Sequence, residues 1–158
     1  MSAKTGGSGE KTVCLNRRAR FEYEILETFE AGMVLVGTEV KSLRQGQASI
    51  KEAFADIVGG EAFLGDSHIP PYVLGNIHNH EPKRRRKLLL GKREIQRLGS
   101  KTAEKGLTLI PLRIYFRKGL AKVELALAKG KKTHDKRETI RRREAEREMA
   151  REMGRQRR

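Results

Sequence analysis

The most regular alternation of apolar and polar residues lies between residues 107 and 128. In its first half the apolar side chains fall at Leu112, Ile114 and Phe116. The second half repeats the period of two at Ala121, Val123, Leu125 and Leu127. This pattern predicts two strands, each with one buried face, joined in a hairpin at Gly119. Pro111 has no N–H for a strand ladder, so we expect it at an edge or a bulge.

Two earlier stretches predict further strands. Residues 21–36 change phase around Leu26 and Phe29, which indicates a long strand with a bulge or bend, and Gly32 is the candidate site for it. In residues 53–66 two apolar runs flank a Gly-Gly pair at 59–60, which can adopt the positive φ angles of a tight hairpin.

Helical spacing appears in two segments. Residues 38–46 predict about two turns of helix, with Thr38 as N-cap and Gly46 as the end. Residues 91–106 predict a second amphipathic helix. Short strands with a helix or two favour a mainly β fold with flanking helices, namely a small OB-fold-like β-barrel followed by a basic C-terminal tail.

Composition divides the chain into three parts. Residues 1–14 are rich in Gly, Ser, Lys and Thr and predict a flexible N-terminal lead. Residues 15–128 form the expected OB-fold-like RNA-binding domain. Residues 129–158 hold 13 Lys and Arg against 6 Asp and Glu with few apolar residues, so we expect this tail to be disordered when free and helical once a partner screens its charge.

The net charge points to a polyanionic partner. The chain has 35 Lys and Arg against 20 Asp and Glu, a formal charge of +15. A membrane-surface binder should offer a basic helix with a broad apolar face, and this chain has no Trp and an almost wholly polar basic helix. With no signal peptide visible and one cysteine, Cys14, we expect a cytoplasmic, monomeric protein that makes no membrane contact.

Three basic clusters indicate binding of phosphates, and few aromatic residues are left for base stacking. The clusters are Arg17, Arg18 and Arg20; Lys83, Arg84, Arg85, Arg86 and Lys87 in a loop; and Lys129, Lys131, Lys132, Lys136 and Arg137. Each phosphate that a cation neutralises releases counterions and adds affinity. We therefore expect a structured RNA that is read by its shape. Leu88, Leu89 and Leu90, which follow the second cluster, cannot all point inward from a loop. One is a candidate for an exposed wedge against an unstacked base, although burial of all but an edge is the commoner outcome.

Catalytic and metal-dependent alternatives find less support. His78 and His80 lack further ligands at zinc spacing, and the carboxylates Asp56, Glu61 and Asp66 show no spacing that a metal-dependent nuclease requires. We expect no enzyme activity, metal site or cofactor. A ribosomal or ribosome-assembly RNA-binding protein would look similar on charge alone, and that alternative stays open.

Several strings, in order, resemble the small protein B family, the tmRNA-binding proteins of bacterial trans-translation. They are NRRARFEYEI, FEAG, GTEVKSLRQG, GEAFL, RKLLL, KREI and AKGKKTHDKRE followed by Ile140, and they run from about Leu15 to about Arg142. The resemblance implies an OB-fold barrel that binds the tRNA-like domain of tmRNA. With elongation factor Tu and alanyl-tmRNA, it would enter the vacant decoding site of a stalled ribosome.

The resemblance also implies two sets of site residues. Glu30 and Leu89 match positions that contact tmRNA, and Arg17, Arg18, Arg20 and Lys87 lie in the same implied surface. Gly91 stands where the family commonly has Asn or His, so we leave it out of the site. The tail would become helical in the mRNA channel and meet small-subunit ribosomal RNA at the decoding centre through Lys131, Lys132, His134, Asp135, Lys136, Arg137 and Ile140.

Overall fold

The computed structural model describes residues 10–74, 79–104, 106–131 and 133–156. Its strands are β1 (Glu10–Leu15), β2 (Tyr23–Met33), β3 (Phe54–Val58), β4 (Glu61–Gly65), β5 (Arg86–Leu89), β6 (Leu107–Arg117) and β7 (Leu120–Gly130). Its helices are α1 (Ala19–Glu22), α2 (Gly37–Arg44), α3 (Lys92–Thr102) and α4 (Thr133–Gln156).

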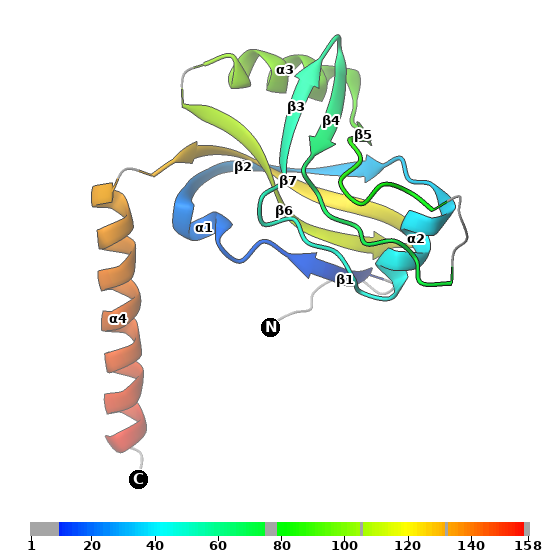
Figure 1. The fold of residues 1–158 in the computed structure, drawn as a ribbon. Helices are drawn as coiled ribbons and strands as arrows, with labels where there is room; N and C mark the ends of the chain where they lie inside the picture. The colour runs from blue at the N-terminus through cyan, green and yellow to red at the C-terminus, as the bar shows by residue number, and fades with distance from the viewer. Residues whose placement is uncertain (1–9, 75–78, 105, 132, 157–158) are drawn as a thin grey trace.

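Six of these strands close into a ring. The antiparallel order is β6-β3-β4-β5-β2-β7, and pairing of β7 with β6 completes it, while β1 lies on the outer edge of β6 (Figure 1). Inside the ring pack buried apolar side chains, among them Ala31, Leu64, Leu88, Ile114, Val123 and Leu125. The expected mainly β, OB-like fold with flanking helices is confirmed.

The two predicted hairpins form. The β6–β7 hairpin turns at Lys118 and Gly119, both at positive φ, and its register shifts between Pro111 and Arg113. The bulge expected at Pro111 is therefore present. The β3–β4 hairpin turns at Gly59 and Gly60, with φ of 58° and 78°. A two-residue turn with both φ angles positive matches the right-handed twist of its strands.

The long strand differs from the prediction at both ends and in its bulge. Residues Ala19–Glu22 form the one-turn helix α1, and β2 begins at Tyr23 and ends at Met33. The register with β7 shifts between Ile25 and Glu27, as the change of phase around Leu26 indicated, but there is no bulge at Gly32. Past the shift, the side chains of Ala31 and Met33 point into the core. The side chain of Glu30 points outward, and Gly32 lies on the same outer side of the strand.

The strand β1 corrects the expected boundary of the N-terminal lead. Glu10–Leu15 pairs with β6, so the last residues of the expected 1–14 lead belong to the folded domain, and residues 1–9 lie outside the described residues. The ladder with β6, the packing of Val13 and Cys14 against the core, and ion pairs from Glu10 to Arg113 and Arg117 offset the entropy of ordering this segment. The residues near β1 in the sequence give no sign of its pairing with β6 or of its ion pairs with Arg113 and Arg117.

The strand β5 corrects the expected basic loop. Arg86–Leu89 lies between β4 and β2, so the second half of the Lys83–Lys87 block is strand. Leu88 points into the core and Leu89 points outward, as alternation along a strand requires. The expectation that one leucine is exposed is confirmed.

Both predicted helices of the core are present. In α2 the N-cap is Val36 rather than Thr38, and the Glu39 carboxylate accepts a hydrogen bond from the Val36 N–H at 2.9 Å. Gly46, at φ 76°, follows the end of that helix as expected. In α3 the completely buried Leu98 anchors the helix, which contacts β3 and β6.

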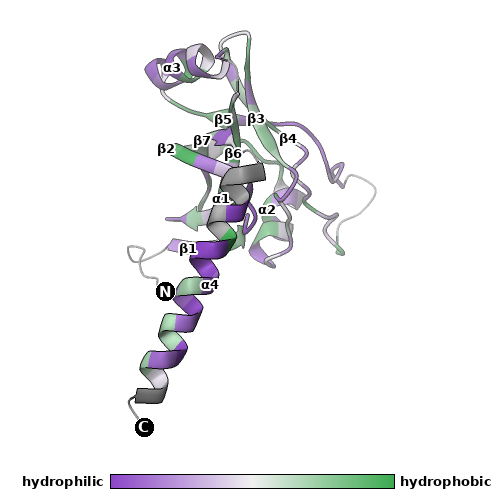
Figure 2. Cartoon of the chain, turned by 90° about the vertical axis from the view of Figure 1, so that its left-hand side faces the viewer, coloured by the Kyte–Doolittle hydropathy of each residue, from purple (hydrophilic) through white to green (hydrophobic). Residues whose placement is uncertain are grey.

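The C-terminal segment forms a helix. β7 runs to Gly130, two residues past the expected boundary at Ala128, and α4 extends from the ring as a mostly hydrophilic rod (Figure 2). Its disorder in the free protein stays a prediction. No helix of the described residues is long and apolar enough to cross a membrane.

Candidate RNA-binding surface

The first arginine cluster surrounds α1. Arg17, Arg18 and Arg20 are all exposed. The preceding residue, Asn16, fixes this turn to the bulge of β6: its backbone N–H donates to the Leu112 carbonyl at 2.8 Å and its Nδ2 to the Pro111 carbonyl at 3.1 Å. The arginines thus project from a backbone that is held at a defined place.

The start of the tail lies against the same turn. The Lys131 backbone N–H donates to the Glu22 carbonyl at 2.9 Å, and its Nζ donates to the Arg20 carbonyl at 3.0 Å. One α4 side chain also returns to α1, because the Arg143 guanidinium lies 5.9 Å from the centre of the Phe21 ring. The structure therefore brings two of the three predicted basic clusters together.

Arg86 of the Lys83–Lys87 cluster is buried, which corrects the sequence interpretation. The Arg86 side chain has no exposed surface, and its Nη2 lies 2.6 Å from Oε2 of the equally buried Glu39. Arg86 also donates to the Ser67 hydroxyl at 3.0 Å and to the Ser67 carbonyl at 2.9 Å. A charge block in the sequence cannot reveal this, because Glu39 is 47 residues away.

The neighbouring cations also have acidic partners. Arg84 binds Glu39 at 2.7 Å, Arg85 binds Asp56 at 2.7 Å, and Lys87 pairs with Glu61. Burial alone would raise the pKa of Glu39, but hydrogen bonds from Arg84, the Val36 N–H and Arg86 lower it overall. Arg84 and Arg86 share Glu39, so two carboxylates offset two of the three charges of Arg84–Arg86 within the protein.

Glu30, by contrast, stands on the outer face of the ring. Its Oε2 accepts a hydrogen bond from the Tyr115 hydroxyl and lies 2.9 Å from Arg117 Nη1. Burial, followed by the bond to Glu30, raises the pKa of Tyr115, so this hydroxyl stays protonated and donates at neutral pH.

A layer of charges holds Tyr115 in place. The Arg113 guanidinium lies 4.0 Å from the centre of the Tyr115 ring. Glu10 joins the two arginines, with Oε1 2.8 Å from Arg113 and Oε2 3.2 Å from Arg117. Sequence reasoning missed this network around Glu30. Its only local signal was that Arg113, Tyr115 and Arg117 share the polar side of β6.

Leu89 lies beside Glu30 on the same outer face. Leu89 is opposite Gly32 in the β2–β5 ladder, and Glu30 is two residues before Gly32. A Cβ at Gly32 would lie 3.4 Å from the Leu89 Cβ, so the glycine leaves room for a leucine side chain that is 55% exposed. Lys87, two residues before Leu89, shares this face. We call Glu30, Lys87 and Leu89 the Glu30–Leu89 surface.

The predicted tmRNA residues thus fall in two places. We call the segment around α1 that carries Arg17, Arg18 and Arg20 the arginine turn. It ends at Tyr23, seven residues before Glu30, so about 23 Å of strand β2 separates it from the Glu30–Leu89 surface. Of the tail residues, Lys131 is at the turn, and Arg137 and Ile140 are exposed on α4. Lys132 lies outside the described residues, as do the side chains of His134, Asp135 and Lys136.

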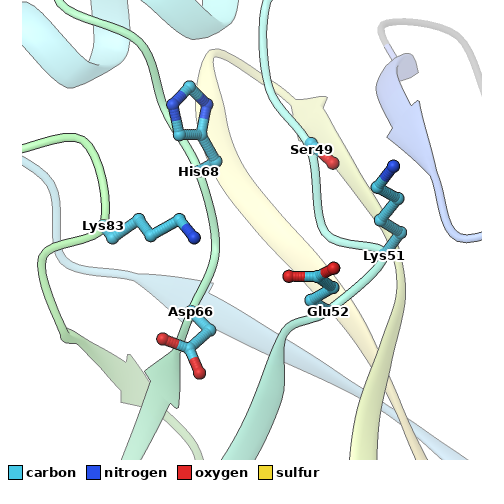
Figure 3. A pocket seen from close by; sticks show the side chains of 6 residues that line it. All are labelled: Ser49, Lys51, Glu52, Asp66, His68 and Lys83. Atoms are coloured by element: carbon cyan, nitrogen blue, oxygen red, sulfur yellow. The ribbon is translucent and has the colours of Figure 1, made fainter.

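The carboxylates considered for a nuclease do not gather. Asp56 and Glu61 pair with Arg85 and Lys87, whereas Asp66 lines a separate polar hollow together with Ser49, Lys51, Glu52, His68 and Lys83 (Figure 3). Within the described residues no three His, Cys, Asp or Glu side chains are placed to hold a metal ion.

Of the two histidines considered as zinc ligands, His80 is held inside the protein. Its ring is hydrogen-bonded to Thr38 Oγ1 and to the Ile69 carbonyl, each at 2.8 Å, while His78 lies outside the described residues.

Comparisons with known proteins agree on one family. The sequence profile of the family described as "SmpB protein" matches residues 13–155. The SsrA-binding protein of Desulforudis audaxviator is 67% identical over 90% of this chain and 93% of that protein. The SsrA-binding protein of Pelotomaculum thermopropionicum is 62% identical over 89% of this chain and 92% of its own length.

A solved structure agrees in fold as well. It is described as "tmRNA-SmpB: a journey to the center of the bacterial ribosome", is 52% identical in sequence, and superposes with a TM-score of 0.67 over 82% of this chain and 94% of that one.

Proposed function

Because this chain belongs to the SmpB protein family, we propose that it binds tmRNA and acts with it on the ribosome in trans-translation. In that process a stalled ribosome is rescued and its incomplete protein is tagged. The observation that carries the proposal is the match of residues 13–155 to the family, together with a solved relative described with tmRNA and the ribosome.

The Glu30–Leu89 surface and the arginine turn are the proposed contacts with the tRNA-like domain of tmRNA. A carboxylate held by Tyr115 and Arg117 is pre-oriented, so it can accept hydrogen bonds from base or ribose groups without losing side-chain freedom on binding. Leu89 adds an exposed apolar contact for an unstacked base, and Arg17, Arg18 and Arg20 supply charges for the backbone.

The tail is the proposed contact with the ribosome. The residues Lys131, Lys132, His134, Asp135, Lys136, Arg137 and Ile140 would meet small-subunit ribosomal RNA at the decoding centre and in the mRNA channel. Support comes from α4, which is hydrophilic and extends away from the ring (Figure 1). We further propose that the protein works in the cytoplasm as a monomer, and that elongation factor Tu with alanyl-tmRNA joins the complex.

The RNA that co-purifies with the protein tests this function. The affinity-tagged chain, isolated from cells at increasing salt, should retain a single tmRNA-sized RNA. Recovery of ribosomal RNA alone would instead favour a ribosomal or ribosome-assembly protein. Cleavage of the RNA after addition of a divalent metal ion would favour a nuclease.

A further inference from the structure

The cations of this protein differ in whether a carboxylate already neutralises them. Arg84, Arg85 and Arg86 each lie within 2.7 Å of a carboxylate oxygen, and on α3 Arg97 pairs with Glu27. A cation that is already paired must give up its partner before it binds a phosphate. Its contribution to RNA affinity is therefore smaller than that of an unpaired cation.

A group of unpaired cations lies where α2 meets the β6–β7 turn. Lys41 and Arg44 are exposed and lie one turn apart on α2, and Arg44 Nη2 is 3.5 Å from the Gly119 carbonyl, beside Lys118. In the part of the chain that the structure describes, none of these three forms an ion pair within 4.0 Å. We call Lys41, Arg44 and Lys118 the α2 cluster.

Aromatic rings hold two of these side chains without neutralising them. The Arg44 guanidinium carbon lies 4.8 Å from the centre of the Phe116 ring, and the Lys41 Nζ lies 5.6 Å from the centre of the Tyr72 ring. Such contacts restrict the side chain and leave its full positive charge at the surface. Ordered, unpaired cations are well suited to bind phosphates.

The backbone at Lys118 adds a second observation. Lys118 has a φ of 52°, in a two-residue turn where Gly, Asn or Asp would fit with less strain. Strain kept at a surface turn suggests that the side chain there has a use. The residue after Lys118 in this turn, Gly119, is the one whose carbonyl lies near Arg44.

The α2 cluster borders the Glu30–Leu89 surface. Arg117, the residue before Lys118, reaches Glu30 at 2.9 Å. From this continuity we propose that the α2 cluster binds backbone phosphates of the same tmRNA that contacts Glu30 and Leu89, while Arg84–Arg86, the most basic string in the core sequence, contributes little. The inference rests on the proposed function and adds a binding surface to it.

Two double variants of equal charge test the proposal. Arg44→Gln/Lys118→Gln removes two unpaired cations, and Arg85→Gln/Arg97→Gln removes two cations that are paired with Asp56 and Glu27 and lie 4.6 Å and 5.9 Å from Phe rings. Affinity for tmRNA is measured between 50 and 300 mM salt in the full-length chain. The plot of log K against log salt falls with a negative slope, and the first variant should reduce the magnitude of that slope by about 2, one for each lost phosphate contact. The second should leave the slope close to that of wild type.

Each other outcome counts against something definite. A wild-type slope for Arg44→Gln/Lys118→Gln would overturn the α2 cluster as a phosphate contact. An equally reduced slope for Arg85→Gln/Arg97→Gln would overturn the claim that paired cations contribute little. A loss confined to ribosome binding, with tmRNA affinity unchanged, would overturn the assignment to tmRNA. Failure of the wild-type chain to bind tmRNA would instead overturn the proposed function itself. If the Arg44 change unfolds the protein, Lys118→Gln alone, in an exposed turn, should lower the slope by about 1.

Discussion

The Tyr115 hydroxyl donates a hydrogen bond to the Glu30 carboxylate across the outer face of the ring, with β7 between their two strands. Tyr115 therefore sets the orientation of Glu30 before any RNA arrives. We predict that Tyr115→Phe lowers tmRNA affinity about fivefold, the effect of losing about 1 kcal/mol of hydrogen bonding. Binding titrations measure it, and thermal unfolding of the same variant reports any loss of stability. Unchanged affinity combined with a lower melting temperature would make the pair purely structural.

Leu89→Ala should weaken tmRNA binding with little effect on folding. The side chain is 55% exposed in the free protein, so its methyl groups add little to stability until RNA covers them. Covering them should contribute about 1–2 kcal/mol to binding. Val58→Ala is a matched control, because Val58 is 51% exposed at the tip of the β3–β4 hairpin. Equal losses of affinity in both variants would remove Leu89 from the site.

Arg86→Met should lower the free energy of unfolding, because it leaves the buried Glu39 carboxylate with Arg84 as its remaining cation. Breaking a buried ion pair by removing one partner costs about 3–5 kcal/mol. Urea unfolding measures this loss. The double variant Glu39→Met/Arg86→Met should recover part of it, since no buried carboxylate remains. A cost below about 1 kcal/mol for Arg86→Met would contradict the structural role.

The Glu39–Arg86 ion pair should also make the stability of the protein depend on pH in acid. The pKa of Glu39 is lower in the folded protein than its ordinary value of 4.5. Its contribution to the free energy of unfolding is therefore fully present above about pH 4.5 and is lost as the pH falls through the lower folded pKa. The urea midpoint should fall as the pH is lowered below about 4.5, and less steeply in Glu39→Gln.

Cys14 should be slow to react with alkylating reagents at neutral pH. Burial in β1 raises the pKa of its thiol to about 11, although the backbone hydrogen bond involving Ile114 lowers it. The thiolate is the reactive form, so iodoacetamide should modify Cys14 at pH 8 far more slowly in the native protein than in urea. Mass spectrometry follows the modification. Equal rates in the two conditions would show that β1 is not docked on β6.

Removal of the tail should separate the two proposed binding events. The position of the stop matters, because Ala128 and Gly130 pair with β2 and Lys131 bonds to α1. A chain that ends after Lys131 should keep tmRNA affinity close to that of the full chain at physiological salt and lose tagging of stalled chains. Equal loss of both activities would refute this division. A stop after Ala128 should also destabilise the β2–β7 ladder, which thermal unfolding would report.

The parts of the fold that the sequence predicts are those with local signals. The alternation in β6 and β7, the two-glycine turn at 59–60 and the spacing of α2 and α3 all depend on residues close together in the chain. The strands that were missed depend on distant partners. β1 is ordered by β6, about a hundred residues away, and β5 begins inside a charge block.

The candidate site shows the same limit. The resemblance identifies Glu30 and Leu89, but nothing near Glu30 in the sequence points to Tyr115 or Arg117, which are more than eighty residues away. Likewise, five consecutive cations look equivalent in the sequence. Only the fold distinguishes the buried Arg86 from the exposed Lys87, because alternation along β5 sends one into the protein and the other to the surface.

The double attachment of Lys131 to α1 fixes the place at which the tail leaves the ring. A helix turns by about 100° and rises about 1.5 Å with each residue, so the 24 residues of α4 span about 36 Å from an origin fixed to the ring. The length of α4 therefore sets how far from the ring its C-terminal end can reach.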